Sequence, residues 1–215
     1  MKITDGLHAF PWKSTSANNC NTYFLDGPAK ILIDPGHFNF FHHVAGELTA
    51  LGIELSDIDL VIATHAHPDH FEGVMHFRNQ PALFAMGLED WNLIRRIPGQ
   101  TGLEEFTPDF FLGPGSLEVK GVTLTVVPSP GHSPGSVALY WPERKALIPG
   151  DVIFRDGLGR TDLPGGNGAV LKESIRRLAS LDTEFLLPGH GEIVRGSARV
   201  RENFTRVEEF WFHYI

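Results

Sequence analysis

The segment HAHPDH at residues 65–70 is the feature that most constrains this chain, because it puts four potential metal ligands directly after the apolar run 58–63: His65, His67, Asp69 and His70. Imidazole and carboxylate ligands together suit zinc, iron or manganese, whereas calcium takes mostly oxygen ligands. Side chains two apart in an extended strand exit point to the same side. His65 and His67 are therefore predicted to hold one ion, and Asp69 and His70, beyond Pro68, a second. A surface loop with chance histidines is the alternative, but four ligands in six residues argue against it.

Three later positions repeat one pattern, in which an apolar strand run is followed by glycine and then by a residue able to bind metal: Gly131-His132, Gly150-Asp151 and Gly189-His190. Glycine lets the backbone turn sharply at a strand end and approach a buried ion. Each histidine alone would more often be a loop or core residue. Together with the upstream cluster they predict a binuclear centre with these assignments: His65, His67 and His132 on one ion, Asp69, His70 and His190 on the other, and Asp151 as the bridge.

Such a centre has a defined chemistry. Two ions about 3.5–4 Å apart can share a water, lower its pKa toward ~7 and present hydroxide to an electrophile. After the charges of two aspartates and one hydroxide are counted, two divalent ions leave one net positive charge. We therefore expect an anionic substrate or a polarised carbonyl group.

The rest of the chain alternates strand and helix patterns. Strands are predicted at five runs: 21–26, 30–33, 58–63, 122–126 and 184–187. Residues 136–141 and 145–148 predict a hairpin. Helices are predicted from the apolar spacing after Phe41 and from caps at Asn167 and Ser197. Residues 84–116 contain several glycines and prolines, and much of this segment is predicted to be loop. Grouped strands with intervening helices favour sheets covered by helices on the outside.

The charge and composition of the chain limit the kinds of partner and the cell compartment that we expect. The formal charge of −8 argues against a general nucleic-acid binder. No apolar stretch approaches the roughly 20 residues that span a bilayer, and no signal peptide is visible, so no membrane partner is expected. The single Cys20 cannot form an internal disulfide, which fits a reducing, cytoplasmic setting. Four aromatic residues could line a pocket, a core or a homodimer face: Phe106, Phe110, Phe111 and Phe212.

The ordered set His65-x-His67-x-Asp69-His70, His132, Asp151 and His190 resembles the metallo-β-lactamase superfamily over essentially the whole chain, and Asp34 matches that family's first, weaker motif. The resemblance implies one domain over residues 1–215. It also implies an αββα sandwich, in which two mixed β-sheets lie face to face with helices on the outer faces and metals at one edge. From its place at a strand end, Asp34 could orient a ligand histidine or could simply form a turn.

Two segments, 129–136 and 150–154, are similar to the glyoxalase II branch of that family. The 159–166 loop resembles one shared by short glyoxalase II-like hydrolases and persulfide dioxygenases, which implies that Arg160 lies near the metals and contacts substrate. An ion pair with Asp162 that shapes the loop is the alternative. Glyoxalase II proper has a C-terminal helical domain whose basic residues hold glutathione. Only residues 191–215 follow the last ligand here, so no such separate domain is expected, and a solvated helix face explains the basic residues equally: Arg195, Arg199, Arg201 and Arg206.

The leading hypothesis is hydrolysis of a small thioester of the hydroxyacyl-glutathione type by a metal-bridging hydroxide. Asp69 would act as a catalytic residue that orients the water while it binds metal. Two divalent ions are expected, with zinc preferred and iron or manganese as alternatives. The competing functions are a persulfide dioxygenase with one iron on His65, His132 and Asp151, a lactonase or related hydrolase of the same fold, and an inactive metal-binding scaffold.

Overall fold

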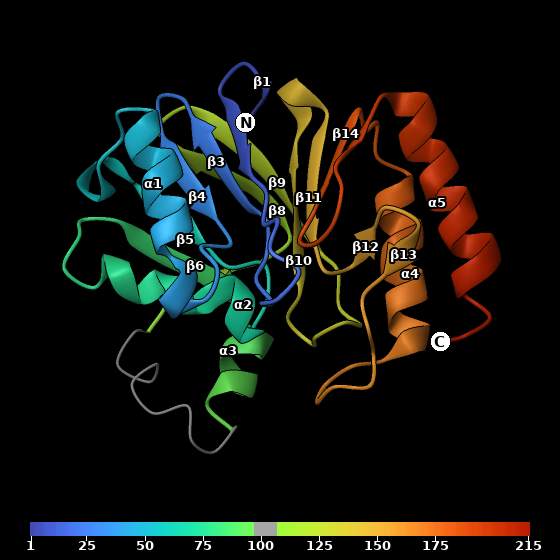
Figure 1. Cartoon of the computed structure of the whole chain (residues 1–215). Helices are drawn as coiled ribbons and strands as arrows, with labels where there is room; N and C mark the ends of the chain where they lie inside the picture. Colours follow the sequence, from blue (N-terminus) through green and yellow to red (C-terminus); the bar gives the residue numbers. More distant parts are fainter. Residues whose placement is uncertain (97–106) are drawn as a thin grey trace.

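Two β-sheets lie face to face in the computed structural model, which describes residues 1–96 and 107–215 (Figure 1). The first sheet has the spatial order β1 (Lys2–Thr4), β2 (Leu7–Phe10), β3 (Thr22–Asp26), β4 (Lys30–Ile33), β5 (Leu60–Ile62), β6 (Leu83–Gly87) and β7 (Phe110–Leu112). The second sheet has the order β15 (Val194–Arg195), β14 (Phe185–Pro188), β11 (Ala146–Gly150), β10 (Val137–Trp141), β9 (Val122–Pro128) and β8 (Gly115–Val119). β12 (Ile153–Phe154) and β13 (Gly157–Leu158) form a separate short hairpin.

Both sheets mix strand directions. In the first sheet β1 to β4 pair antiparallel, and β4 to β7 pair parallel. In the second sheet β14 pairs parallel with β11, and the other neighbours are antiparallel. The prediction of two mixed sheets is confirmed.

The helices are α1 (His42–Ala50), α2 (Pro68–Phe71), α3 (Leu88–Ile94), α4 (Gly168–Ala179) and α5 (Ser197–Trp211). Short 3-10 helices lie at Phe38–Phe40, Leu55–Asp57, Glu72–Phe77 and Pro142–Arg144. None of the helices in the described part of the chain is long and apolar enough to cross a membrane.

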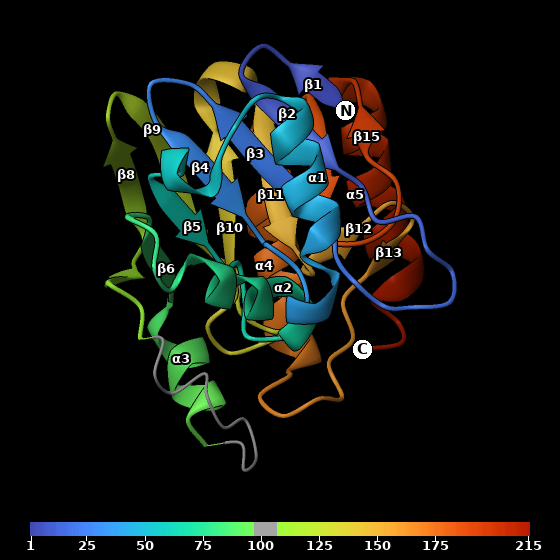
Figure 2. The ribbon, with the colours of Figure 1, turned by 60° about the vertical axis from the view of Figure 1, so that its left-hand side comes forward.

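Three apolar clusters hold these layers together. Between the sheets, strand residues such as Tyr23 and Leu139 are fully buried against one another. On the outer face of the first sheet, Val44 of α1 packs with Val61 of β5. On the outer face of the second sheet, α4 and α5 bury their apolar sides against β10, β11 and β14. Figure 2 shows α1 across the sheet that contains β3 and β4, with α5 on the far side. The expected αββα order is thus confirmed.

Several local predictions hold. Asn167 caps α4, because its side-chain oxygen accepts from Val170 N at 3.1 Å. The predicted hairpin is formed by β10 and β11 around residues 142–144. Of the four aromatic residues considered above, Phe110 packs partly against the core between the sheets, Phe111 is exposed and Phe212 is buried with α4 and α5. Phe106 lies outside the described residues.

Two predictions were wrong. Much of the segment 84–116 was expected to be loop, but most of the residues that the structure describes there belong to β6, α3, β7 and the start of β8. Glycine and proline residues in this segment are concentrated at 98–102 and 113–115. They made the whole segment resemble a loop, although short apolar runs lie beside them. Ser197 does not cap α5 either. The cap position is Gly196, with φ of +96°, and Ser197 is the first helical residue.

Candidate metal centre

Four strand ends bring the predicted ligands to one place. β9 and β11 both pair antiparallel with β10 and so run in the same direction, and β14 runs parallel to β11. Their carboxyl ends therefore meet at one edge of the second sheet, where the chain continues to His132, Asp151 and His190. β5 of the first sheet ends beside them, because Val137 N of β10 donates to Thr64 O at 2.9 Å. This edge collects side chains from both sheets.

Three imidazoles face one another on one side of the centre. His65 Nε2 lies 3.1 Å from His67 Nδ1, and His132 Nε2 lies 2.8 Å from the same His67 atom. Potential ligand atoms of all three residues lie within 4.8 Å of one another. This is the group that sequence analysis assigned to a single ion.

Asp69, His70 and His190 form the other group. His190 Nε2 lies 3.2 Å from His70 Nε2 and 3.3 Å from Asp69 Oδ2. Asp151 stands between the two groups. Its Oδ1 lies 3.2 Å from His70 Nε2, and its Oδ2 lies 3.3 Å from His190 Nε2 and 3.6 Å from His132 Nε2. A carboxylate in this position can bridge two ions, and the structure brings all seven predicted side chains together.

Asp34 lies behind the centre and is fully buried. Its Oδ1 accepts from Thr64 N at 2.7 Å, and its Oδ2 accepts from Thr64 Oγ1 at 2.8 Å and from His70 Nδ1 at 2.9 Å. Its φ is +55°, so it also forms the turn after β4. Asp34 therefore combines both roles considered from sequence, and it directs the Nε2 of His70 into the centre.

Similar contacts orient two other rings. Because Thr64 Oγ1 donates to Asp34, it must accept from His65 Nδ1, which lies 3.1 Å away. His132 Nδ1 donates to the backbone oxygen of Arg160 at 2.7 Å. In both histidines the Nε2 lone pair is left facing the centre.

In the metal-free site, some of the histidines are protonated at neutral pH and others are neutral. Burial alone would lower the pKa of His70 and His190, but the carboxylates outweigh it. Asp151 and Asp34 raise the pKa of His70 well above its ordinary value, and hydrogen bonds to Asp151 and Asp69 raise that of His190 to about 9. Both imidazoles therefore carry protons at neutral pH when no cation is bound.

The other ligands are already in the form that binds metal. Burial lowers the pKa of His65 well below its ordinary value and that of His67 to about 4, with neighbouring imidazoles acting in the same direction. Burial would raise the pKa of Asp69 and Asp151, but contacts with the histidines hold both below the ordinary range. Neutral imidazole and ionised carboxylate are the ligand forms that metal binding requires.

These residues fit a pair of divalent ions. His67 Nδ1 lies 3.1 Å from the Nε2 atom of His65 and 2.8 Å from that of His132, and a hydrogen on it could serve only one of those two lone pairs, whereas a cation between the rings would satisfy all three nitrogen atoms. The buried Oδ1 of Asp151 has no aligned hydrogen bond to any described residue, although His70 Nε2 lies 3.2 Å away. A buried carboxylate oxygen is costly unless it is well bonded, and an ion beside it would supply that bond. The nitrogen and oxygen donors suit zinc, iron or manganese.

The three glycines that precede the later ligands are required for different reasons. A Cβ on Gly189 would lie 2.2 Å from Asp151 Oδ1, directly against a ligand. On Gly150 it would lie 2.4 Å from Thr64 Oγ1, the group that holds His65. On Gly131 it would instead meet the backbone of α4 at 2.4 Å. The predicted close approach to the site therefore holds for two of the three, and Gly131 serves helix packing.

The centre opens into a pocket of about 560 Å³. Phe154, Leu158 and Leu163 supply apolar lining, and Arg160 lines it as well. The exposed Arg160 side chain donates to both carboxylate oxygens of Asp162, from Nε at 2.7 Å and from Nη2 at 2.6 Å. Arg160 thus lies at the pocket and also makes the ion pair that was its alternative role.

Two polar residues of the site were not identified from sequence. Asn18 lines the pocket, and its Nδ2 donates to Asp69 Oδ2 at 2.7 Å. Thr64 links Asp34 to His65, as described above. Asn18 lies in the loop between β2 and β3, where no pattern marks it. Thr64 could have been found as a polar residue directly before the ligand cluster.

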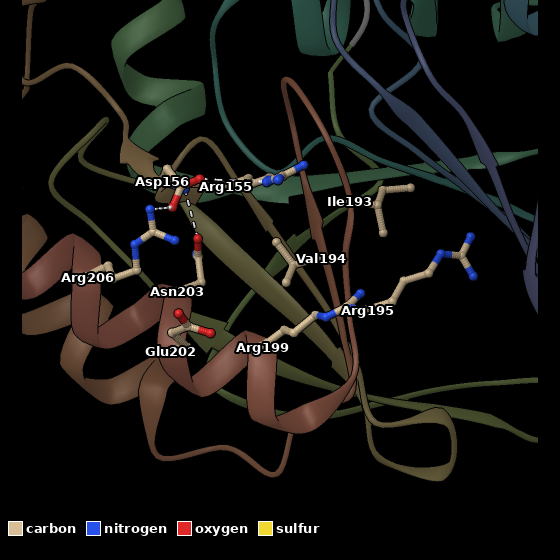
Figure 3. Close-up of a pocket in the computed structure, with 9 residues that line it drawn as sticks. All are labelled: Arg155, Asp156, Ile193, Val194, Arg195, Arg199, Glu202, Asn203 and Arg206. Atoms are coloured by element: carbon tan, nitrogen blue, oxygen red, sulfur yellow. Dashed lines mark hydrogen bonds and ion pairs between the residues drawn. The ribbon is translucent and has the colours of Figure 1, made fainter.

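A second pocket, of about 250 Å³, lies between α5, β15 and the turn after β12 (Figure 3). It is lined by Arg155, Arg195, Arg199 and Arg206, among others, and it shares no lining residue with the metal pocket. Asp156 pairs with Arg206 at 3.1 Å. Of the described residues, no arginine of α5 lines the pocket that holds the metal centre.

Known proteins resemble this chain along most of its length. The family model described as the metallo-beta-lactamase superfamily matches residues 15–190. A probable metallo-hydrolase of Methanocaldococcus jannaschii is 34% identical over 193 residues, which cover 80% of this chain and 88% of that protein. Hydroxyacylglutathione hydrolase GloC of Haemophilus influenzae is 29% identical over 206 residues, which cover 86% of this chain and 91% of that protein. Among solved structures, TTHA1623 in a di-iron-bound form matches with a TM-score of 0.71 and 29% identity, covering 86% of this chain and 93% of that one.

The family match covers most of both sheets and the whole ligand edge. The family match begins before β3 and ends at His190, so it includes all seven side chains that meet at the centre. The chain therefore belongs to the metallo-β-lactamase superfamily of metal-binding hydrolases.

Proposed function

We propose that this protein hydrolyses small anionic thioesters of the hydroxyacyl-glutathione type. The proposal rests on one observation, the convergence of five imidazoles and two carboxylates from two sheets at one centre, where five of the seven side chains line a single pocket. The similarity to hydroxyacylglutathione hydrolase GloC over 91% of that protein supports the choice of a thioester. Fold alone would leave the substrate open, because this architecture carries many activities.

Two divalent ions, zinc first and iron or manganese as alternatives, would be held by the two groups of ligands with Asp151 between them. When bound, they would act as Lewis acids and lower the pKa of a shared water toward ~7. Full use of both groups favours two ions. A single iron on His65, His132 and Asp151 would leave four converging side chains without a role.

The residues of the chain supply orientation and binding. Asp69 accepts the side-chain hydrogen bond of Asn18, which fixes the carboxylate beside His190 so that it can hold the attacking water in position. The second N–H of the Asn18 amide remains available for the substrate carbonyl oxygen. Phe154, Leu158 and Leu163 would cover the thioester and exclude bulk water. Arg160 would bind the anionic end of the substrate by exchanging Asp162 for it.

The test begins with protein purified without added metal, whose metal content is measured by elemental analysis. Metal-replete protein is then assayed against hydroxyacyl-glutathione thioesters and matched oxygen esters, with chelator-treated protein as the control. We expect hydrolysis of the thioesters that disappears on chelation and returns with metal. Failure on every thioester would refute the proposal. One iron per chain together with oxygen consumption on glutathione persulfide would favour the dioxygenase instead.

A further inference from the structure

Asp90 is a carboxylate outside the ligand set, in the first turn of α3, and its side chain is fully buried. It accepts three hydrogen bonds. Oδ2 accepts from Ala66 N at 2.7 Å and from Ser133 Oγ at 2.6 Å, and Oδ1 accepts from Gly135 N at 2.5 Å. A buried carboxylate is tolerated only when such donors satisfy it. The three donors therefore determine where Asp90 can lie, and Asp90 in turn holds them.

The donors belong to two loops that carry metal ligands. Ala66 lies between His65 and His67, and Ser133 directly follows His132. These histidines are the three-imidazole group. Among the described residues, no hydrogen bond joins Asp90 to residues 68–70, 150–151 or 189–190, which carry the other ligands. The contacts of Asp90 are thus confined to one half of the centre.

The packing around Asp90 leaves little freedom. A Cβ on Gly135 would lie 2.3 Å from Asp90 N, and a Cβ on Gly87 would lie 2.1 Å from Gly135 O. The turn 133–136 is also closed on itself, because Ser133 N donates to Ser136 Oγ at 3.2 Å. The start of α3 therefore sits directly on this turn. A shift of Asp90 would be transmitted to both ligand loops.

An acidic residue in the first turn of a helix has a simpler explanation, since it interacts favourably with the positive end of the helix dipole. That explanation would leave the carboxylate near solvent, at the amide groups of its own helix. Here the side chain instead bonds across to the loops at 66 and 133–135.

We propose that Asp90 is a positioning residue that sets the spacing of His65, His67 and His132, so that it controls the affinity of one metal ion and not of the other. The inference rests on the metal centre of the proposed function, but not on its substrate. Partners of this kind behind metal ligands typically change metal affinity by roughly 10–100-fold when mutated.

Asp90→Asn is the primary test, because it keeps the shape of the side chain. Asparagine offers one acceptor oxygen and an NH₂ group, which cannot accept from the donor it would face. Metal-free protein is titrated with Zn²⁺ against a competing chelator, and with Co²⁺ while its absorption spectrum is recorded. We expect one ion to bind roughly 10–100-fold more weakly and the other to bind as in the wild type. His132→Ala and His190→Ala provide reference spectra for damage to either half, and Asp90→Asn should resemble His132→Ala.

Asp59→Asn is the matched control. Its carboxylate accepts from Lys30 N at 2.9 Å, but at the opposite end of β5 from the ligands, so it should leave both affinities unchanged. Ser133→Ala removes one of the three hydrogen bonds to Asp90. It should weaken the affinity for the same ion, but by less than Asp90→Asn does. This variant keeps the proposal testable if Asp90→Asn does not fold. Equal weakening of both ions, or wild-type affinity for both, overturns the proposal. Absence of thioester hydrolysis would refute the proposed function and leave this result standing.

Discussion

Replacing Gly189 by alanine would disturb the centre through a single methyl group. The φ of Gly189 lies outside the left-handed region, so alanine can adopt the backbone. The added Cβ would lie 2.2 Å from Asp151 Oδ1 and 2.6 Å from His70 Cε1, whereas ordinary contacts begin at 3.4 Å. Restoring ordinary contact requires displacements of about 1.2 Å and about 0.8 Å, the differences between those distances. Both affected side chains are predicted ligands, and Asp151 is the predicted bridge.

The magnitudes follow from those displacements. Forcing a methyl group into a packed site typically costs ~1–3 kcal/mol of stability. A misplacement of about 1 Å at a reacting centre costs roughly 10²-fold in rate. Gly189→Ala should therefore fold, melt at a lower temperature, bind less metal and turn over about 10²-fold more slowly.

Gly191→Ala provides the control on the same segment. Gly191 has a φ of +76°, and a Cβ there would meet nothing within 4 Å. Alanine in this conformation costs ~1–2 kcal/mol through backbone strain. The two variants should thus be destabilised to a similar degree, while only Gly189→Ala loses metal and activity. Thermal unfolding, elemental analysis and steady-state kinetics measure the three quantities. Equal loss of metal in both variants, or none in Gly189→Ala, would refute the steric argument.

Three further perturbations give distinct readouts. Asp69→Asn should lower turnover by roughly 10²–10⁴-fold with an unchanged circular dichroism spectrum, because the carboxylate both binds metal and orients water; retained turnover would contradict this role. Metal binding at pH 7 should release about two protons, from His70 and His190, whose raised pKa values keep them protonated in the metal-free protein. Calorimetric titration in two buffers of different ionisation enthalpy detects that release, and identical heats would argue against it. Asp162→Ala should leave the melting temperature unchanged, since the pair is exposed, and should lower KM for anionic substrates by freeing Arg160; an unchanged KM would remove Arg160 from substrate binding.

The convergence of these seven side chains could be predicted from sequence because each is marked by a local pattern. The cluster 65–70 is contiguous, and His132, Asp151 and His190 each follow an apolar run and a glycine. That repeated pattern reflects the topology, since β9, β11 and β14 all point toward the same edge. Strand order itself was not predictable from the pattern, but a shared direction was enough to bring the ligands together.

The segment 84–116 shows where local pattern fails. β7 has only three residues, too few for alternation to be recognised, and α3 begins at Leu88 after Gly87, which gives no side-chain cap. Both elements depend on tertiary pairing: β7 extends the first sheet beside β6, and α3 buries Trp91 and Ile94 against its outer face. Short elements stabilised mainly by such contacts carry little signal of their own.

At the site too, a residue that acts through tertiary contacts can lack a local sequence signal, as a comparison of Asp34 with Asp90 shows. Both are fully buried carboxylates that hold ligand segments in place, yet only Asp34 could be proposed from sequence, because it follows a strand and a family motif matches it. Asp90 lies in the first turn of a helix, where an acidic residue has a sufficient local explanation in the helix dipole. Its donors are 24 to 45 residues away and belong to loops whose proximity exists only in the folded chain. A carboxylate that has a plausible local role can therefore also have a tertiary role that the sequence does not indicate. Its burial and the identity of its hydrogen-bond donors distinguish the two roles.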